Sequence, residues 1–321
     1  MKSFDDWSSP FLKTKASRWP VESSPKYLDP KTLAKVKDLE VRARRIVEGF
    51  VSGSHKSPFQ GVSVEFAEHR QYTPGDDTRH IDWKLFGKTD KYYLKRYEQE
   101  TNLVCNLVID TSESMKYGSG KMTKLDFTRE LAAVLAYLVL HQQDSVGAAF
   151  FEHKLRYLIP PSGQASHMNQ ILHLLAVCQP ANVTSRIGPV LNELAGRWTK
   201  RSLVFVMTDG FDDVDTMIQG LRHLRHRRHE VALLHVLDPA ELDFPFSDVT
   251  LFKGLEGLPE SLVEPRSIRR AYREEFEKFR REVEVGCRSA DVDYMLVRTD
   301  EPLDRLLTRY LSTRASRRSL A

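Results

Sequence analysis

Residues 106–114 read Asn-Leu-Val-Ile-Asp110-Thr-Ser112-Glu-Ser114, and this stretch decides the fold. An apolar strand that starts near Leu103 ends here in one carboxylate and two hydroxyls, each two residues from the next. Side chains two positions apart in an extended chain point to the same side. Asp110, Ser112 and Ser114 should therefore converge just beyond the strand end, where their hard oxygen atoms suit Mg²⁺ or Mn²⁺.

The chain after residue 102 alternates apolar strands with amphipathic helices. We expect strands at 103–110, 145–151, 154–159, 203–207, 231–237 and 294–297. We expect helices at 124–142, 165–177, 187–198, 214–227 and 266–285, and a last one from 302 onward. This alternation predicts an α/β fold, a doubly wound and mostly parallel sheet covered by helices on both faces. Ligands of such sheets bind beyond the carboxyl ends of the strands, close to the point where the strand order reverses.

We divide the chain of 321 residues into four segments. Residues 1–28, rich in Ser, Pro and Lys, are expected to form a flexible N-terminal arm. Residues 29–101 are expected to hold an amphipathic helix and then a small β-rich subdomain, inserted before the main domain. Residues 102–313 form the α/β domain, and residues 314–321 form a tail.

Composition excludes several classes of protein. The formal charge of +4 is small for this length. We identify no basic stripe with interleaved aromatic residues, so we do not expect a nucleic-acid partner. The three cysteines are far apart and form no CxxC pair, which is typical of a reducing compartment. The longest apolar run, 131–140, is about half of the ~20 residues that a membrane span requires. With no apolar leader after Met1, these features predict a cytoplasmic protein.

Two further loops should reach the same edge of the sheet as Asp110. Asp209 closes a second apolar strand, and the polar loop 182–188 opens a helix. Either Thr184 or Ser185 in that loop could supply another hydroxyl. Two carboxylates and three hydroxyls would leave one coordination position of a divalent ion vacant. The alternative is that these Ser and Asp side chains cap helices without any metal.

This arrangement resembles the metal-ion-dependent adhesion site of von Willebrand factor A domains. The resemblance implies direct ligation by Ser112, Ser114 and a hydroxyl of the middle loop, while Asp110 and Asp209 act through water. It also implies that an acidic side chain of a partner protein fills the open position. The spacing permits either Thr184 or Ser185 as the ligand from the middle loop, and we slightly favour Thr184.

A second motif, residues 65–84, is dense in charge but also contains several aromatic and apolar residues. A solvated face would not need those rings. We expect a half-buried network in which the two arginines pair with aspartates, and a Pro-Gly turn. Its candidate members are Arg70, Asp76, Asp77, Arg79, Asp82, Trp83 and Lys84. The alternative is a purely architectural role, tying this segment to the sheet.

This motif is followed in the chain by the strand that ends in Asp110. Together, in this order, the two features strongly resemble the bacterial domain of unknown function 58 family. The resemblance covers about residues 30–315 and implies a von Willebrand A-like fold. It also implies a partnership with a MoxR-type AAA+ ATPase, as an adaptor or in protein maturation. We therefore expect a non-enzymatic, metal-dependent protein-binding module that uses Mg²⁺ or Mn²⁺.

The principal rival function is a Mg²⁺-dependent phosphohydrolase in which Asp110 is the nucleophile. That chemistry needs a second aspartate two residues further on as a general acid, and Ser112 stands there instead. A hydroxyl ligates a metal well but protonates a leaving group poorly. ATP hydrolysis by a phosphate loop at 117–123 is also disfavoured, because Met115 and Met122 occupy two of the defining positions.

Overall fold

The computed structural model describes residues 30–52, 65–73, 83–89, 91–98, 103–164, 166–180, 185–248, 250–252 and 261–318. The N-terminal arm that we predicted at 1–28 lies outside these residues. The first element is the helix α1 (Pro30–Ser52). It packs against α3 (Lys124–His141) and α4 (His167–Val177), and its Ala43 and Val47 enter the main core.

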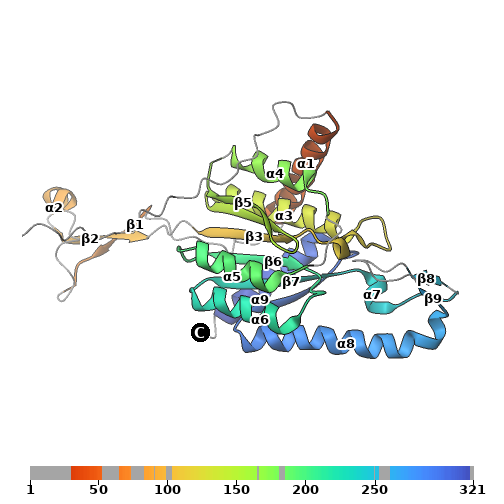
Figure 1. Ribbon diagram of the computed structural model, residues 1–321. Helices are drawn as coiled ribbons and strands as arrows, with labels where there is room; N and C mark the ends of the chain where they lie inside the picture. Colours follow the sequence, from red (N-terminus) through yellow and green to blue (C-terminus); the bar gives the residue numbers. More distant parts are fainter. Residues whose placement is uncertain are drawn as a thin grey trace, which may run out of the picture.

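A small unit of two strands and one helix precedes the main domain. Strands β1 (Glu65–Gln71) and β2 (Tyr93–Glu98) form an antiparallel pair, and the short helix α2 (Trp83–Thr89) lies between them in the chain. Figure 1 shows this unit to one side of the α/β domain. The helix α2 was not predicted from the sequence.

The main sheet has six strands in the order β10-β7-β6-β3-β4-β5. These are β3 (Val104–Asp110), β4 (Ser145–Phe151), β5 (Leu155–Ser162), β6 (Leu203–Thr208), β7 (Glu230–Leu237) and β10 (Asp293–Arg298). All neighbours are parallel except β5, which pairs antiparallel with β4 at the edge. The strand order is that of a doubly wound fold, and it reverses between β3 and β6. The predicted fold class is confirmed.

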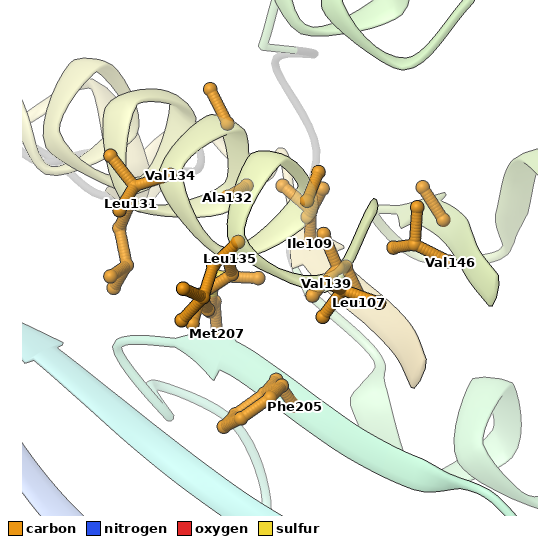
Figure 2. Packing of buried hydrophobic residues seen from close by; sticks show 14 of the residues in the cluster. Leu107, Ile109, Leu131, Ala132, Val134, Leu135, Val139, Val146, Phe205 and Met207 are labelled. Carbon is orange, nitrogen blue, oxygen red and sulfur yellow. The ribbon is translucent and has the colours of Figure 1, made fainter. Parts of the chain in front are cut away.

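Helices cover both faces of this sheet. One layer contains α1, α3, α4 and α9 (Leu303–Arg318), and the other contains α5 (Ile187–Arg197), α6 (Val214–His226) and α8 (Pro265–Ser289). Strand β3 serves both layers because its side chains alternate: Leu107 and Ile109 pack below α3, and Val108 packs on the opposite side. Figure 2 shows α3 lying over Leu107 and Ile109 and over Phe205 and Met207 of β6.

Short elements lie beyond the carboxyl ends of the strands. They are the 3₁₀ helix η2 (Glu113–Lys116), the helix α7 (Pro239–Asp243) and the two-stranded sheet of β8 (Thr250–Phe252) and β9 (Ser261–Val263). Figure 1 shows α7, β8 and β9 on the same side of the domain. Across the part of the chain that the structure describes, no helix is both long and apolar enough to cross a bilayer.

Candidate metal centre

The end of β3 places three polar side chains in a buried position. Asp110 and Ser112 are fully buried and Ser114, in η2, is 5% exposed. The hydroxyl oxygens of Ser112 and Ser114 lie 3.1 Å apart. Neighbouring ligands of an octahedral Mg²⁺ ion are about 3 Å apart, because each bond is about 2.1 Å long. The two hydroxyls therefore already have the separation that one such ion requires.

Asp110 holds these loops together through hydrogen bonds to both of its carboxylate oxygens. Oδ1 accepts the backbone N–H of Ser112 at 2.9 Å, and Oδ2 accepts the hydroxyls of Thr208 at 2.6 Å and Ser185 at 3.3 Å. These donors come from the ends of β3 and β6 and from the loop before α5. Three donors occupy most of the roughly four acceptor positions of this carboxylate, so Asp110 is better suited to contact a metal through water than directly.

The middle loop reaches the site through Ser185, which is 4% exposed. Thr184, which we favoured from the sequence, lies outside the described residues, so the choice between the two hydroxyls stays a prediction. Thr208 was not predicted as part of the site. Its position directly before Asp209, at the end of an apolar strand, was the available signal.

The electrostatics of the site are compatible with a bound cation. Burial, and secondly the charge of Asp209, raise the pKa of Asp110 to about 7. Two aspartates that interact in a buried site need a nearby positive charge to remain ionised together. A divalent ion beside Ser112 and Ser114 would supply that charge. The donor set and its charge therefore fit Mg²⁺ or Mn²⁺.

Asp209 has a resident cationic partner that the sequence did not reveal. The ammonium group of Lys124 lies 2.8 Å from Asp209 Oδ2 and 2.6 Å from Glu241 Oε1 of α7, and this lysine side chain is fully buried. Its nitrogen is also 4.8 Å from the centre of the Phe211 ring. Burial lowers the pKa of Lys124, but the two carboxylates outweigh it and the net pKa is raised, so the lysine stays charged.

Backbone contacts fix the Asp209 loop. Gly210 adopts a positive φ of 68°, which a glycine tolerates without strain. The imidazole of His235 on β7 donates through Nε2 to the backbone oxygen of Asp209 at 2.8 Å and accepts the Tyr294 hydroxyl at Nδ1 at 3.0 Å. Burial lowers the pKa of His235 to about 4, so the ring is neutral. His235 therefore positions the loop without adding charge to it.

The described residues contain no cluster of three His, Cys, Asp or Glu side chains spaced for a metal ion. The candidate centre is instead of the hydroxyl-rich kind, with Ser112, Ser114 and Ser185 beside Asp110. Asp209 is close enough to Asp110 to raise the pKa of that carboxyl group, and its own carboxylate binds Lys124.

The second motif is only partly described. Asp76, Asp77, Arg79 and Asp82 lie outside the described residues, Arg70 lies in β1, and Lys84 lies in α2. Trp83, at the start of α2, is 63% exposed. It contacts the rings of Phe86 and Tyr92 edge-on. The predicted ion-pair network therefore stays a prediction.

The loop at 117–123 has a structural role. Ser119 donates its backbone N–H and its hydroxyl to Asp238, at 3.0 and 2.5 Å, and Thr123 caps α3 by accepting the N–H of Asp126. These contacts join the loop after β3 to the start of α7. The same contacts seat Lys124 at the first position of α3.

The strand order and the two helix layers define a doubly wound α/β protein. Residues 68–284 match the family described as protein of unknown function DUF58, and the chain belongs to that family. Two curated relatives are the uncharacterized proteins Rv1480 of Mycobacterium tuberculosis and Mb1516 of Mycobacterium bovis. Each is 26% identical over 293 residues, covering 89% of this chain and 90% of the relative.

Three solved structures are also similar. BatB from Bacteroides thetaiotaomicron has a TM-score of 0.46 and 14% identity, over 67% of this chain and 99% of that one. An aerotolerance-related membrane protein from Bacteroides fragilis has a TM-score of 0.44 and 16% identity, over 66% and 99%. The SpRpn10 VWA domain has a TM-score of 0.38 and 11% identity, over 65% and 95%. All three TM-scores are below 0.5, so we take nothing about the site from these similarities.

Proposed function

We propose that this chain is a non-enzymatic protein-binding module whose binding depends on Mg²⁺ or Mn²⁺. Ser112, Ser114 and a hydroxyl of the middle loop would hold the ion, and Asp110 and Asp209 would act on it through water. The observation that carries this proposal is the 3.1 Å separation of the two buried serine hydroxyls beside the buried carboxylate of Asp110.

The donor set favours binding over turnover. Neutral hydroxyls leave the bound ion electron-poor, so it gains affinity when an anionic group of a partner arrives. The rival phosphohydrolase would require a free oxygen on Asp110 for attack. Both oxygens of Asp110 instead accept hydrogen bonds, one of them from Thr208 at 2.6 Å.

The partner would contribute a Glu or Asp side chain to the open coordination position. The family resemblance points to a MoxR-type AAA+ ATPase, which would supply the ATP hydrolysis for protein assembly or maturation. In this proposal the chain acts as the adaptor in the cytoplasm, and its metal site is the switchable contact.

Calorimetric titration of Mn²⁺ tests the site. We expect heat from one binding event with wild type and none with the double variant Ser112→Ala, Ser114→Ala. Ser289→Ala, an exposed serine near the end of α8, is the matched control and should titrate as wild type. An absence of heat with wild type would remove the metal site from the account.

The partner and the rival function need separate assays. Copurification with a MoxR-type ATPase should succeed in Mg²⁺ and fail in chelator. A complex of equal strength in chelator would show that the metal does not hold it. Hydrolysis of an aryl phosphate by wild type that Asp110→Asn abolishes would instead establish the phosphohydrolase.

A further inference from the structure

The first half of α8 extends beyond the sheet. The helix has 25 residues and is therefore about 37 Å long. Its second half packs into the core through Val283 and Cys287, whereas Pro265 is the only buried residue in its first half. Figure 1 shows the N-terminal part of α8 running below α7 toward β9.

Four arginines form one stripe on this first half. Arg266, Arg269, Arg270 and Arg273 follow the spacing i, i+3, i+4 and i+7, which places them on one helix face. The first turn holds no acidic residue. Positive charge near a helix N-terminus opposes the helix dipole, so this stripe weakens the isolated helix and favours an external anion.

In the second half of α8, the arginines form ion pairs with glutamates of the same helix. Arg280 and Arg281 pair with Glu277, and Arg288 pairs with Glu284. In the first half, Arg270 pairs with Glu274, and Arg269 donates to the backbone oxygen of Phe246 at 2.5 Å.

Arg266 and Arg273 are exposed, and they have no ion pair within the described part of the chain. The first half of α8 therefore carries uncompensated positive charge, at Arg266 and Arg273, and the second half has its arginines paired with glutamates. A groove of about 630 Å³ runs beside the stripe, and its wall also holds Leu242, Phe276 and two carboxylates, Glu274 and Glu277, that are already paired with arginines.

An apolar pocket of about 460 Å³ lies on the adjoining side of α8. Its walls include Phe211, Ile268, Tyr272, Phe276 and Phe279. The rings of Phe211 and Phe279 stack at 5.4 Å, and those of Tyr272 and Phe276 at 5.6 Å. Phe276 lines both the pocket and the basic groove, so the two surfaces are continuous.

We propose that this half of α8 is a docking surface for an acidic protein segment that carries an apolar or aromatic side chain. The acidic residues would pair with Arg266 and Arg273, and the apolar side chain would enter the pocket beside Phe276. Charge complementarity selects this occupant. A nucleic acid is disfavoured because the stripe covers only two helical turns and so offers few contacts to a phosphate backbone.

Binding of the acidic segment to this surface requires no metal. A test in chelator therefore examines this proposal independently of the proposed metal site. Random peptides displayed on phage would be selected against the full chain in the presence of chelator. We expect enrichment of acidic peptides that contain an aromatic or large apolar residue. Their affinity should fall by about tenfold or more in the double variant Arg266→Glu, Arg273→Glu and should weaken with salt.

Exposed positions supply the remaining variants, so that folding is preserved. Ala271→Asp places a negative charge at the pocket and should also weaken binding, whereas Arg222→Glu, an exposed arginine of α6, should not. Enrichment of non-acidic peptides, no enrichment at all, or equal binding by the double variant would overturn the proposal. Single-stranded DNA binding that the double variant abolishes would also overturn it and assign the surface to nucleic acid.

Discussion

Lys124 is the residue on which the candidate site depends most for its charge balance. Its ammonium group is buried between Asp209 and Glu241, and the Phe211 ring shields it further. A buried ion pair contributes little net stability, but removal of one partner leaves uncompensated charge and is costly. Without Lys124, the carboxylates of Asp209 and Glu241 would repel each other. The lysine therefore stabilises the two loops that carry them.

Lys124→Met should lower the free energy of unfolding by about 3 kcal/mol, because Asp209 and Glu241 lose their counter-charge. Urea denaturation at neutral pH measures this. Adding Glu241→Gln should recover part of the loss, since one buried charge is removed. The control is Lys121→Met at an exposed position. Equal stability of Lys124→Met and wild type would show that the lysine is not buried as described.

His235 predicts a pH dependence of stability. Its pKa is about 4 in the folded protein because burial disfavours the charged ring, against 6.5 when exposed. The unfolded chain therefore takes up a proton below pH 6.5 that the folded chain does not. Stability should fall as pH drops from about 6.5 to about 4, by about 3 kcal/mol from this group.

His235→Gln removes the titrating ring and keeps a donor for the Asp209 carbonyl. We expect the variant to lack this acid-dependent loss in denaturation curves recorded across that range. Asp110 acts with the opposite sign, because its raised pKa makes the folded chain retain a proton. That contribution is common to both proteins and cancels in their difference. Parallel stability curves for wild type and variant would refute the assignment of the loss to His235.

Asp110, Ser112 and Ser114 could be predicted from the sequence because neighbouring positions at a strand end determine where they point. Lys124 could not. It looks like an ordinary surface residue at a helix start, and its partners lie 85 and 117 positions away. His235 reads as one more residue of an apolar strand, and only the fold brings it to Asp209.

At the scale of elements, α5 and α6 position the middle loop, and their contact depends on small residues. A Cβ atom on Gly188 would come within 2.6 Å of the backbone oxygen of Thr216. A Cβ atom on Gly220 would come within 2.8 Å of Leu191 Cβ. Since Ser185 lies just before α5, the close packing of these helices helps to place its hydroxyl near Asp110.

Gly188→Ala should therefore destabilise the protein by about 1–3 kcal/mol through overpacking. Gly196→Ala is the matched control on the same helix, because nothing lies within 4 Å of its Cβ position. That variant should be neutral or more stable by up to about 1 kcal/mol, since alanine favours the helix. Thermal denaturation compares them. A Gly188→Ala protein as stable as Gly196→Ala would contradict the close contact.

The long periodic elements were predictable and the short ones were not. Helix α8 was expected at 266–285 and spans Pro265–Ser289, because its amphipathic period is strong. The helix α7 has five residues, too few for periodicity to show, although Asp238-Pro239 is an N-cap followed by a first-turn proline. The segment with α7 matters because it supplies Glu241 to Lys124.

For the whole molecule, the apolar strands and amphipathic helices determine the doubly wound sheet, and the sheet determines where the site lies. The order reverses between β3 and β6, and these strands end in Asp110 and in Thr208 next to Asp209. The site follows from topology, so it could be anticipated in outline. Its charge balance depends on tertiary contacts and required the structure.

The central claim is that one divalent cation binds between the hydroxyls of Ser112 and Ser114. The most direct test is a crystal of the chain grown with Mn²⁺, with anomalous diffraction measured at the manganese edge. We predict a single strong peak about 2.1–2.2 Å from both hydroxyl oxygens. A peak elsewhere, or none at this position while Mn²⁺ is in excess, would contradict the account.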